Sequence, residues 1–285
     1  MRIFFRKGVS ESMIIKTLVE NTSISESIAS EHGLSLYIET KNYKILFDVG
    51  ESNLFLENAE KLDVNISDVD YLIISHGHYD HGGGLRSFLQ ENTKAEVFIH
   101  NLAFQKHYAL KSNDEIDYIG LDEDLKTDKR IIYTGDRFFI NKGIYVFSNI
   151  TQKGPLPKSN SGLLTEDNGQ VIDDIFLHEQ NLVIEEDDET VLITGCAHNG
   201  IINIIKHFYD MRGHMPSYVI GGFHLSSRLV GNENTETIDN IAEYLMDTNA
   251  KYYTCHCTGR EAYKQLKATM DESIDYLKTG SVITI

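Results

Sequence analysis

The segment that most constrains this chain is a cluster of histidines directly after a short apolar run. Residues 71–75 are apolar and short enough to form a buried strand. His76, His78, Asp80 and His81 follow within six residues. Alternate side chains point the same way where a strand ends, so His76 and His78 could converge on one metal ion, and the turn that follows could bring Asp80 and His81 to a second. The sequence therefore predicts a site for two adjacent metals at a strand end.

Apolar runs and amphipathic runs alternate along the rest of the chain. Short runs rich in β-branched and aromatic residues predict strands at residues 13–19, 34–39, 44–48, 71–75, 95–100, 130–133, 143–149, 181–185, 190–194, 217–220, 251–254 and 281–285. Helical spacing of apolar residues predicts helices at residues 53–62, 201–211, 235–246 and 260–270. The first strands resemble antiparallel hairpins, whereas strand and helix alternate in the last third. Residues 151–165 hold two of the three prolines and predict a long loop, either a lid or a surface connection.

Charge and length exclude several classes of protein. The chain has 285 residues and a formal net charge of -17, from 43 Asp and Glu against 26 Lys and Arg. This negative charge repels phosphate backbones, so we expect no nucleic-acid partner. No window is apolar enough for a membrane span or a signal peptide, so we expect a cytoplasmic protein that acts on a small molecule, with its oligomeric state left open. We expect one domain at residues 13–285, with residues 1–12 as an N-terminal extension, because a clear strand pattern begins at Met13.

Further chemistry-bearing residues stand where predicted strands end. They are His198, His224 and His256. A sheet holds such residues rigidly while the following loop leaves them exposed. We expect His198 and His256 to bind metal, and His224 either to bind metal or to contact the reacting group.

The cysteines must be interpreted together with these histidines. Cys196, Cys255 and Cys257 are too few for a disulfide framework. We expect Cys255 and Cys257 to pack as small buried thiols around His256. The other histidines stand singly, and we interpret them as surface or core residues: His32, His100, His107, His207 and His214.

The histidine cluster resembles the His-x-His-x-Asp-His signature of the metallo-β-lactamase superfamily. Upstream, residues 45–50 resemble that superfamily's strand ending in Asp-x-Gly. The resemblance covers most of the chain and implies an α/β fold, a four-layer αββα sandwich of two mixed β-sheets flanked by helices. Residues 195–198 (Gly-Cys-Ala-His), 221–225 (Gly-Gly-Phe-His-Leu) and 255–259 (Cys-His-Cys-Thr-Gly) resemble the branch that includes the methanogen 7,8-dihydropterin-6-methyl-4-(β-D-ribofuranosyl)-aminobenzene-5'-phosphate synthase.

The resemblance also implies a dinuclear metal site and its surroundings. Its implied ligands are His76, His78, Asp80, His81, His198 and His256, with two zinc ions expected and iron or manganese as alternatives. Asp48 would orient a ligand imidazole, or else be a strand-end turn residue.

The sequence departs from the family at two positions of the expected metal site. Where an aspartate usually bridges both metals, this chain has Cys196, so either Cys196 or His198 could take that place. His178 lies near the family's usual upstream histidine without its glycine-rich setting, and we expect it not to bind metal.

Metals held in this way predict hydrolysis by a metal-activated hydroxide of a small, anionic ester or phosphoester. Asp80 would anchor the second metal and orient the nucleophile, and His224 would stabilise an oxyanion or protonate a leaving group. Substrate anions could be met by Gly83, Gly84, Lys158 and Arg228. Two alternatives stay open: a pterin-handling transferase, which condenses a dihydropterin with ribofuranosylaminobenzene phosphate, and a non-catalytic metal-binding protein.

Overall fold

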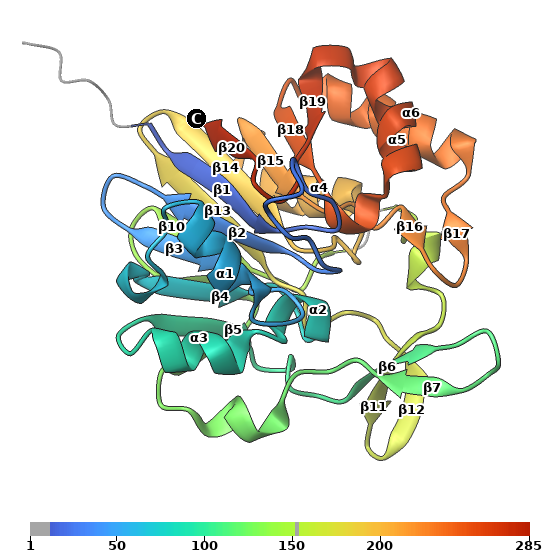
Figure 1. Ribbon diagram of the computed structural model, residues 1–285. Coiled ribbons are helices and arrows are strands. Elements are labelled where there is room, and N and C mark those ends of the chain that lie inside the picture. The colour runs from blue at the N-terminus through green and yellow to red at the C-terminus, as the bar shows by residue number, and fades with distance from the viewer. Residues whose placement is uncertain (1–11, 152–153) are drawn as a thin grey trace, which may run out of the picture.

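Two seven-stranded β-sheets form the body of the protein. The computed structural model describes residues 12–151 and 154–285. The N-terminal extension expected at residues 1–12 therefore lies outside the described residues, except for Ser12. The sheets pack face to face and carry helices on their outer faces (Figure 1). This arrangement is the expected α/β sandwich of four layers, which confirms the predicted fold class.

The first sheet combines an antiparallel part with a parallel part. Its strand order is β20 (Val282–Thr284), β1 (Ile14–Val19), β2 (Ser35–Glu39), β3 (Lys44–Phe47), β4 (Tyr71–Ile74), β5 (Glu96–His100) and β8 (Ile131–Thr134). The pairs from β20 to β3 are antiparallel, and those from β3 to β8 are parallel. Parallel neighbours need crossover connections, which α1 (Leu54–Lys61) and α3 (Leu85–Glu91) supply. The short helix α2 (Tyr79–Gly82) follows β4 and carries part of the histidine cluster.

The second sheet repeats this mixture, and its antiparallel strands again come earlier in the chain than its parallel ones, as in the first sheet apart from β20. Its strand order is β19 (Ile274–Tyr276), β18 (Lys251–Thr254), β15 (Tyr218–Gly221), β14 (Glu189–Thr194), β13 (Asn181–Glu186), β10 (Ile144–Phe147) and β9 (Arg137–Phe139). The pairs from β19 to β14 are parallel and those from β14 to β9 antiparallel. The crossover helices are α4 (Ile201–Arg212), α5 (Thr235–Asp247) and α6 (Arg260–Met270). Each predicted strand and helix of this region is present.

Alternating side chains divide the interior into three apolar layers. In β4, Ile73 points between the two sheets, whereas Leu72 and Ile74 face α1 and α3. In β14, Ile193 points between the sheets and Leu192 faces α4 and α5. A central strand that is buried on both faces reads as a continuous apolar run, and this explains why the strand positions could be predicted.

A third sheet of four strands was not predicted. Its order is β12 (Gln170–Asp173), β11 (Leu163–Asp167), β6 (His107–Leu110) and β7 (Ile116–Tyr118). It projects from the sandwich below the hairpin of β16 (Ser226–Ser227) and β17 (Gly231–Asn232) (Figure 1). Its outer strands are exposed, so their sequences lack the apolar alternation of a core strand. The structure describes the loop predicted at residues 151–165 except for 152–153, and β11 replaces the end of this loop from Leu163 onward.

Gln180 fastens the two sheets together near their common edge. Its completely buried Nε2 donates to the carbonyls of Ile74 (2.7 Å) and Phe98 (3.1 Å) in the first sheet. Its Oε1 accepts the hydroxyl of Thr134 at 2.6 Å. Within residues 12–151 and 154–285, no helix combines the length and apolar character that a membrane span needs.

Replacing Gln180 with leucine should lower the free energy of unfolding by about 2–4 kcal/mol, because two buried carbonyls and a hydroxyl lose their partner. Urea unfolding followed by circular dichroism measures this. The matched control is Gln170→Leu on exposed β12, which should change stability by less than about 0.5 kcal/mol. Equal effects of the two substitutions would show that the contacts of Gln180 do not matter to stability.

Candidate metal centre

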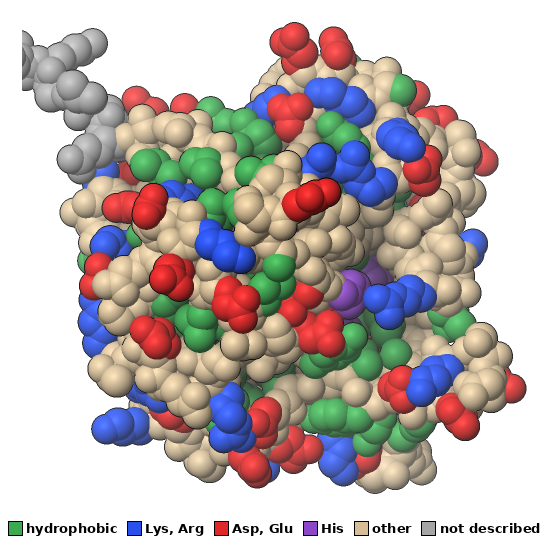
Figure 2. Space-filling model, in the orientation of Figure 1, with side chains coloured by type: hydrophobic (Ala, Val, Ile, Leu, Met, Phe, Trp, Pro, Cys, Tyr) green, Lys and Arg blue, Asp and Glu red, His purple; other side chains and the backbone are tan. Residues whose placement is uncertain are grey.

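The ends of four strands meet at one edge of the sandwich. They are β4 in the first sheet and β14, β15 and β18 in the second, and they are followed by His76, Cys196, His224 and His256 respectively. Gly195 allows the close approach of β14 to β4, because a Cβ at that position would lie 2.2 Å from the Ser75 hydroxyl. Figure 2 shows histidine side chains at the bottom of a hollow on this face of the molecule.

Three imidazoles form a first cluster of donor atoms. Nε2 of His76 lies 3.0 Å from Nδ1 of His78 and 3.3 Å from Nε2 of His198. All three rings are buried. Desolvation by this burial, reinforced by the neighbouring imidazoles, lowers the pKa of each histidine well below its ordinary value. The rings are therefore neutral at pH 7 and present lone pairs, as metal ligation requires.

A second cluster lies beside the first. Nε2 of His81 is 3.2 Å from Nε2 of His256 and 3.2 Å from Sγ of Cys196. Asp80 Oδ2 is 3.3 Å from His256 Nε2. Burial opposes ionisation of Asp80, but the imidazoles of His81, His256 and His32 lower its pKa well below the usual range.

Cys196 lies between the two clusters. Its Sγ lies close to donor nitrogens of His76 and His81, and also to those of His198 and His224. Its thiol is therefore near donors of both clusters, whereas His198 belongs to the first cluster. Burial raises the pKa of the Cys196 thiol, and a bound cation would reverse this effect because it favours the thiolate.

Hydrogen bonds on the outer sides of the rings fix which nitrogen points inward. His81 Nδ1 donates to Asp48 Oδ2 at 2.6 Å, and the Ser75 hydroxyl donates to the same oxygen at 2.7 Å. That hydroxyl therefore accepts from His76 Nδ1 at 2.8 Å. Each of these rings thus directs Nε2 toward the clusters.

Two asparagines hold the remaining rings in the same manner. His198 Nδ1 donates to Asn160 Oδ1 at 3.0 Å, and His256 Nδ1 donates to Asn21 Oδ1 at 3.0 Å. In the first cluster the neutral rings of His76 and His198 consequently face each other with lone pairs, an arrangement that a cation would stabilise. The imidazole, carboxylate and thiol donors suit zinc and also iron or manganese, so the residues present fit the metal centre that the sequence implies.

Two buried carboxylates hold the loops that carry these ligand candidates. Glu179 accepts the backbone N–H of His198 at 2.6 Å, and burial raises the pKa of its carboxyl. Glu20 accepts the backbone N–H of His256 at 2.8 Å. Sequence reasoning examined His178 and passed over Glu179 beside it, and found no signal for Glu20. The role of Glu179 and Glu20 as acceptors becomes recognisable only in the folded structure, where the loops that carry His198 and His256 lie beside them.

His224 reaches the clusters from β15 with a left-handed backbone, at φ 51°. Its ring centroid lies 4.1 Å from that of His198, and neither ring nitrogen has a hydrogen-bond partner among the described residues. Strained residues with unused polar atoms are typical of functional sites. Both roles expected for His224, metal ligand and contact to the reacting group, are compatible with this place.

A cleft of about 880 Å³ opens over the two clusters. It is lined by His78, Asp80, Cys196, His198, His224 and His256 together with His32, Tyr79, Lys111, Ser226 and Arg228. His32, interpreted as a single surface or core residue, bonds through Nε2 to Asp80 Oδ2 at 3.2 Å. Of the thiols expected to pack around His256, Cys257 lines the cleft and Cys255 lies in the core between the sheets.

Several residues predicted to bind substrate do not line this cleft. The N–H groups of Gly83 and Gly84 donate to the carbonyls of Tyr79 (2.6 Å) and Gly50 (3.2 Å), so they are not free to bind an anion. Lys158 also lies outside the lining, although its neighbour Ser159 belongs to it. Arg228 alone of these four is in a position to meet a substrate in the cleft.

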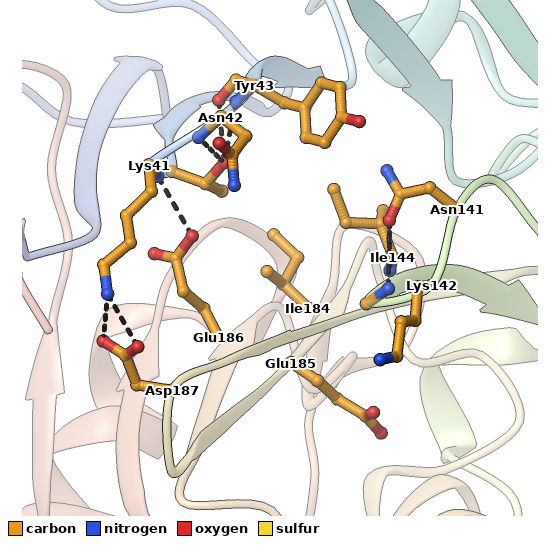
Figure 3. Close-up of a pocket in the computed structure, with 12 residues that line it drawn as sticks. Lys41, Asn42, Tyr43, Asn141, Lys142, Ile144, Ile184, Glu185, Glu186 and Asp187 are labelled. Atoms are coloured by element: carbon orange, nitrogen blue, oxygen red, sulfur yellow. Dashed lines mark hydrogen bonds and ion pairs between the residues drawn. The ribbon is translucent and has the colours of Figure 1, made fainter.

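A second pocket, of about 420 Å³, lies between polar loops at another part of the sandwich (Figure 3). Lys41 reaches across it to pair with Asp187 at 2.6 Å. None of the metal-ligand candidates lines this pocket. It therefore offers no chemistry comparable with that of the cleft.

Comparison with known proteins identifies the class. The sequence profile of the Metallo-beta-lactamase superfamily matches residues 31–224. The crystal structure of Tm1679, a metal-dependent hydrolase of the β-lactamase superfamily, has a TM-score of 0.82 and 28% sequence identity, over 96% of this chain and 99% of that one. The chain belongs to the metallo-β-lactamase superfamily, as its histidine motif implied.

Two curated proteins of Methanocaldococcus jannaschii match over nearly their full lengths. The uncharacterized protein MJ0448 is 31% identical over 287 residues, 95% of this chain and 100% of its own. The 7,8-dihydropterin-6-methyl-4-(β-D-ribofuranosyl)-aminobenzene-5'-phosphate synthase is 29% identical over 293 residues, 97% of this chain and 98% of its own. The resemblance to the branch that includes this synthase is thereby confirmed.

The stability of metal-free protein should fall as the pH drops below about 6.5. The buried rings of His76, His78 and His198, and likewise those of His100 and His178, have pKa values below 6.5 in the folded protein but would titrate near 6.5 in the unfolded chain. The unfolded state thus binds more protons below that pH, which costs about 1–3 kcal/mol between pH 6.5 and 5.5 after the opposite contribution of His81, whose pKa is raised. Urea unfolding of chelator-treated protein at several pH values measures this.

A variant provides the control for this pH dependence. Replacing His76 and His78 together with alanine removes two of these five histidines whose pKa is lowered, so the unfolding free energy of the variant should depend less on pH. An identical slope in the variant would mean that these rings do not carry the effect.

Proposed function

We propose that this protein is a metal-dependent hydrolase that acts on a small, anionic ester or phosphoester in the cleft. The observation that carries the proposal is the pair of donor clusters, with inward lone pairs, on the floor of an open cleft of about 880 Å³. Metal ions held there would lower the pKa of a bound water and polarise the bond under attack. The metal-dependent hydrolase Tm1679, at 28% identity over 96% of this chain, supports the same class.

Asp80 and His224, which lie beside the clusters, would have different roles in the reaction. Asp80 Oδ2 lies 3.2 Å from Nε2 of His32, which can donate to it, and this contact gives the carboxylate a fixed direction in which to orient the attacking water. His224 has both ring nitrogens free of partners in the described structure and lies beside the first cluster. It is placed to hydrogen bond to the developing oxyanion or to protonate the leaving group.

The position of Arg228 supports the proposal that the substrate is anionic. It lies in the turn between β16 and β17, is exposed, and lines the same cleft as His224. No ion pair of Arg228 occurs among the described residues, so its guanidinium can bind an anionic group of the substrate. Lys111, on the opposite wall, is already paired with Asp117 at 2.7 Å.

The second candidate is a pterin-handling transferase, favoured by the 29% identity to the methanogen synthase over 97% of this chain. In that case the same cleft would hold a dihydropterin and a ribofuranosylaminobenzene phosphate for condensation. Incubation with this pair, followed by mass spectrometry, separates the two activities. A condensation product without hydrolysis of any ester would favour the transferase, and hydrolysis without condensation would favour the hydrolase.

Combined replacement of His76 and His78 with alanine should reduce hydrolysis more than about 100-fold, because the first cluster loses two of its three donors. A panel of carboxylic esters, phosphomonoesters and phosphodiesters, assayed with zinc-replete protein, measures this. His214→Ala, at an exposed histidine, is the control and should keep full activity. Undiminished turnover by the double variant would refute the proposed function.

Replacing Arg228 with glutamine should raise KM about tenfold for substrates with an anionic group away from the reacting bond, and leave kcat within about twofold. Steady-state kinetics on charged and neutral substrates with the same leaving group tests this. The matched control is Arg86→Gln, at an arginine outside the cleft that pairs with Asp122. An equal rise in KM for neutral substrates would contradict an anion-binding role for Arg228.

A further inference from the structure

His78 differs from the other imidazoles of the two clusters. His76, His81, His198 and His256 each donate their outer N–H to an oxygen, as described above. His78 directs Nδ1 to the first cluster, which leaves Nε2 on its outer side. That Nε2 is buried and has no hydrogen-bond partner among the described residues. A ligand imidazole almost always donates its second N–H, so this arrangement needs an acceptor.

The ring of His107 lies on that outer side. Its centroid is 5.6 Å from that of His78, and the two rings are nearly perpendicular, at 75°. His107 is completely buried, and its Nε2 likewise lacks a partner in the described part of the chain. Two adjacent buried rings therefore each have one unused nitrogen, and the two nitrogens do not bond to each other in this structure.

Asp174 determines that the unused nitrogen of His107 is an acceptor. The carboxylate oxygen Oδ2 of Asp174 accepts from His107 Nδ1 at 3.0 Å and from His178 Nε2 at 3.1 Å. Burial opposes ionisation of Asp174, but these two hydrogen bonds lower its pKa well below the usual range. With its proton on Nδ1, a neutral His107 carries a lone pair on Nε2. The Nε2–H of a metal-ligating His78 is the donor that matches it.

Gly77 makes the approach of His107 to this strand end possible. A Cβ at residue 77 would lie 2.6 Å from His107 Nε2 and 2.3 Å from the carbonyl oxygen of Ala103. The N–H of Gly77 donates to His178 Nδ1 at 2.9 Å, which fixes the second ring that Asp174 holds. The backbone between the ligand candidates His76 and His78 thus packs directly on this group of residues.

We propose that His107 is a positioning residue of the metal centre, whose Nε2 accepts the Nε2–H of His78 when the metal is bound and so directs His78 Nδ1 at the metal of the first cluster. Asp174 acts through His107 because it fixes the ring's tautomer. The inference rests on the proposed metal centre. It also gives the third sheet a role, because His107 begins β6 and Asp174 directly follows β12, so that this wall of the cleft is connected to a metal ligand.

The same residues are close enough together to suggest a third metal site. Their lone pairs are largely engaged, however. Asp174 Oδ2 accepts two N–H groups, its Oδ1 accepts the N–H of Phe176 at 2.7 Å, and His178 Nδ1 accepts from Gly77. The proposed hydrogen-bonded chain, which leads to the ligand His78, uses all of these atoms. A third cation would have to displace several of their hydrogen bonds.

Zinc titration of chelator-cleared protein, in competition with a fluorescent zinc chelator, tests the proposal. His107→Leu removes the acceptor at similar volume and should weaken one of two zinc equivalents about 10–100-fold while leaving the other unchanged. His107→Gln offers Oε1 near the position of Nε2 and should restore affinity to within a few-fold of wild type. The control is His100→Leu, a buried histidine whose Nδ1 accepts only the nearby N–H of Leu102, and it should bind zinc like wild type.

The outcomes separate this inference from the proposed function. Wild-type protein that binds no zinc would overturn both. Two equally tight equivalents in folded His107→Leu, a glutamine variant as weak as the leucine variant, or a third tight equivalent in wild type would each overturn the positioning role alone. If His107→Leu does not fold, the ¹H–¹⁵N spectrum of zinc-loaded wild type decides: a slowly exchanging proton on His78 Nε2 is expected, and its absence would refute the hydrogen bond.

Discussion

The crowding of unprotonated imidazole nitrogens at one edge of the sandwich is the constraint on which the rest of the structure depends. Nε2 of His76 has neighbouring nitrogens at 3.0 and 3.3 Å, and Nε2 of His81 has one at 3.2 Å. The neutral rings of His76, His78 and His198 repel one another unless a cation lies among them. In the second cluster the carboxylates of Asp80 and Asp48 raise the pKa of His81, so positive charge is favoured there too. Outer acceptors such as Asp48 enforce this arrangement, because each removes the freedom of a ring to turn. The hydrogen bonds of the fold therefore orient these rings so that binding of a metal ion is favoured.

The two sheets supply the rigidity and stability that this arrangement of ligand candidates requires. Strands that end at a common edge bring ligand candidates from distant parts of the chain together on rigid supports, while three apolar layers stabilise the sheets. The loops beyond the strands are held by buried acceptors, Glu179 for the His198 loop and Glu20 for the His256 loop. A buried carboxylate is costly unless its oxygens are hydrogen-bonded, and these two accept backbone N–H groups that would otherwise be unsatisfied.

The cleft above the metal centre has walls of different origin. One wall is formed by the loops of the sandwich and carries His224 and Arg228, and the other by the small sheet that includes β6 and β11. The metal centre thus belongs to the superfamily's shared framework, whereas the substrate would be selected by segments outside the two large sheets. A hydrolase and a synthase are both similar to this chain over nearly its whole length, so the shared fold alone does not decide the reaction.

The sequence by itself predicted most strands of the two large sheets, their crossover helices α1, α4, α5 and α6, and the superfamily, because buried strands are continuous apolar runs and the motif from His76 to His81 is compact. It did not predict the short edge strands β9 and β19. It did not determine the small sheet, whose exposed strands such as β7 and β12 lack that pattern. Only the tertiary structure placed Cys196 between the clusters and His198 in the first one, since both follow a single strand end and their sequence positions are nearly equivalent. It also decided the surroundings of His78, because His107 and Asp174 are 67 residues apart and meet only when β6 and β12 join the same sheet.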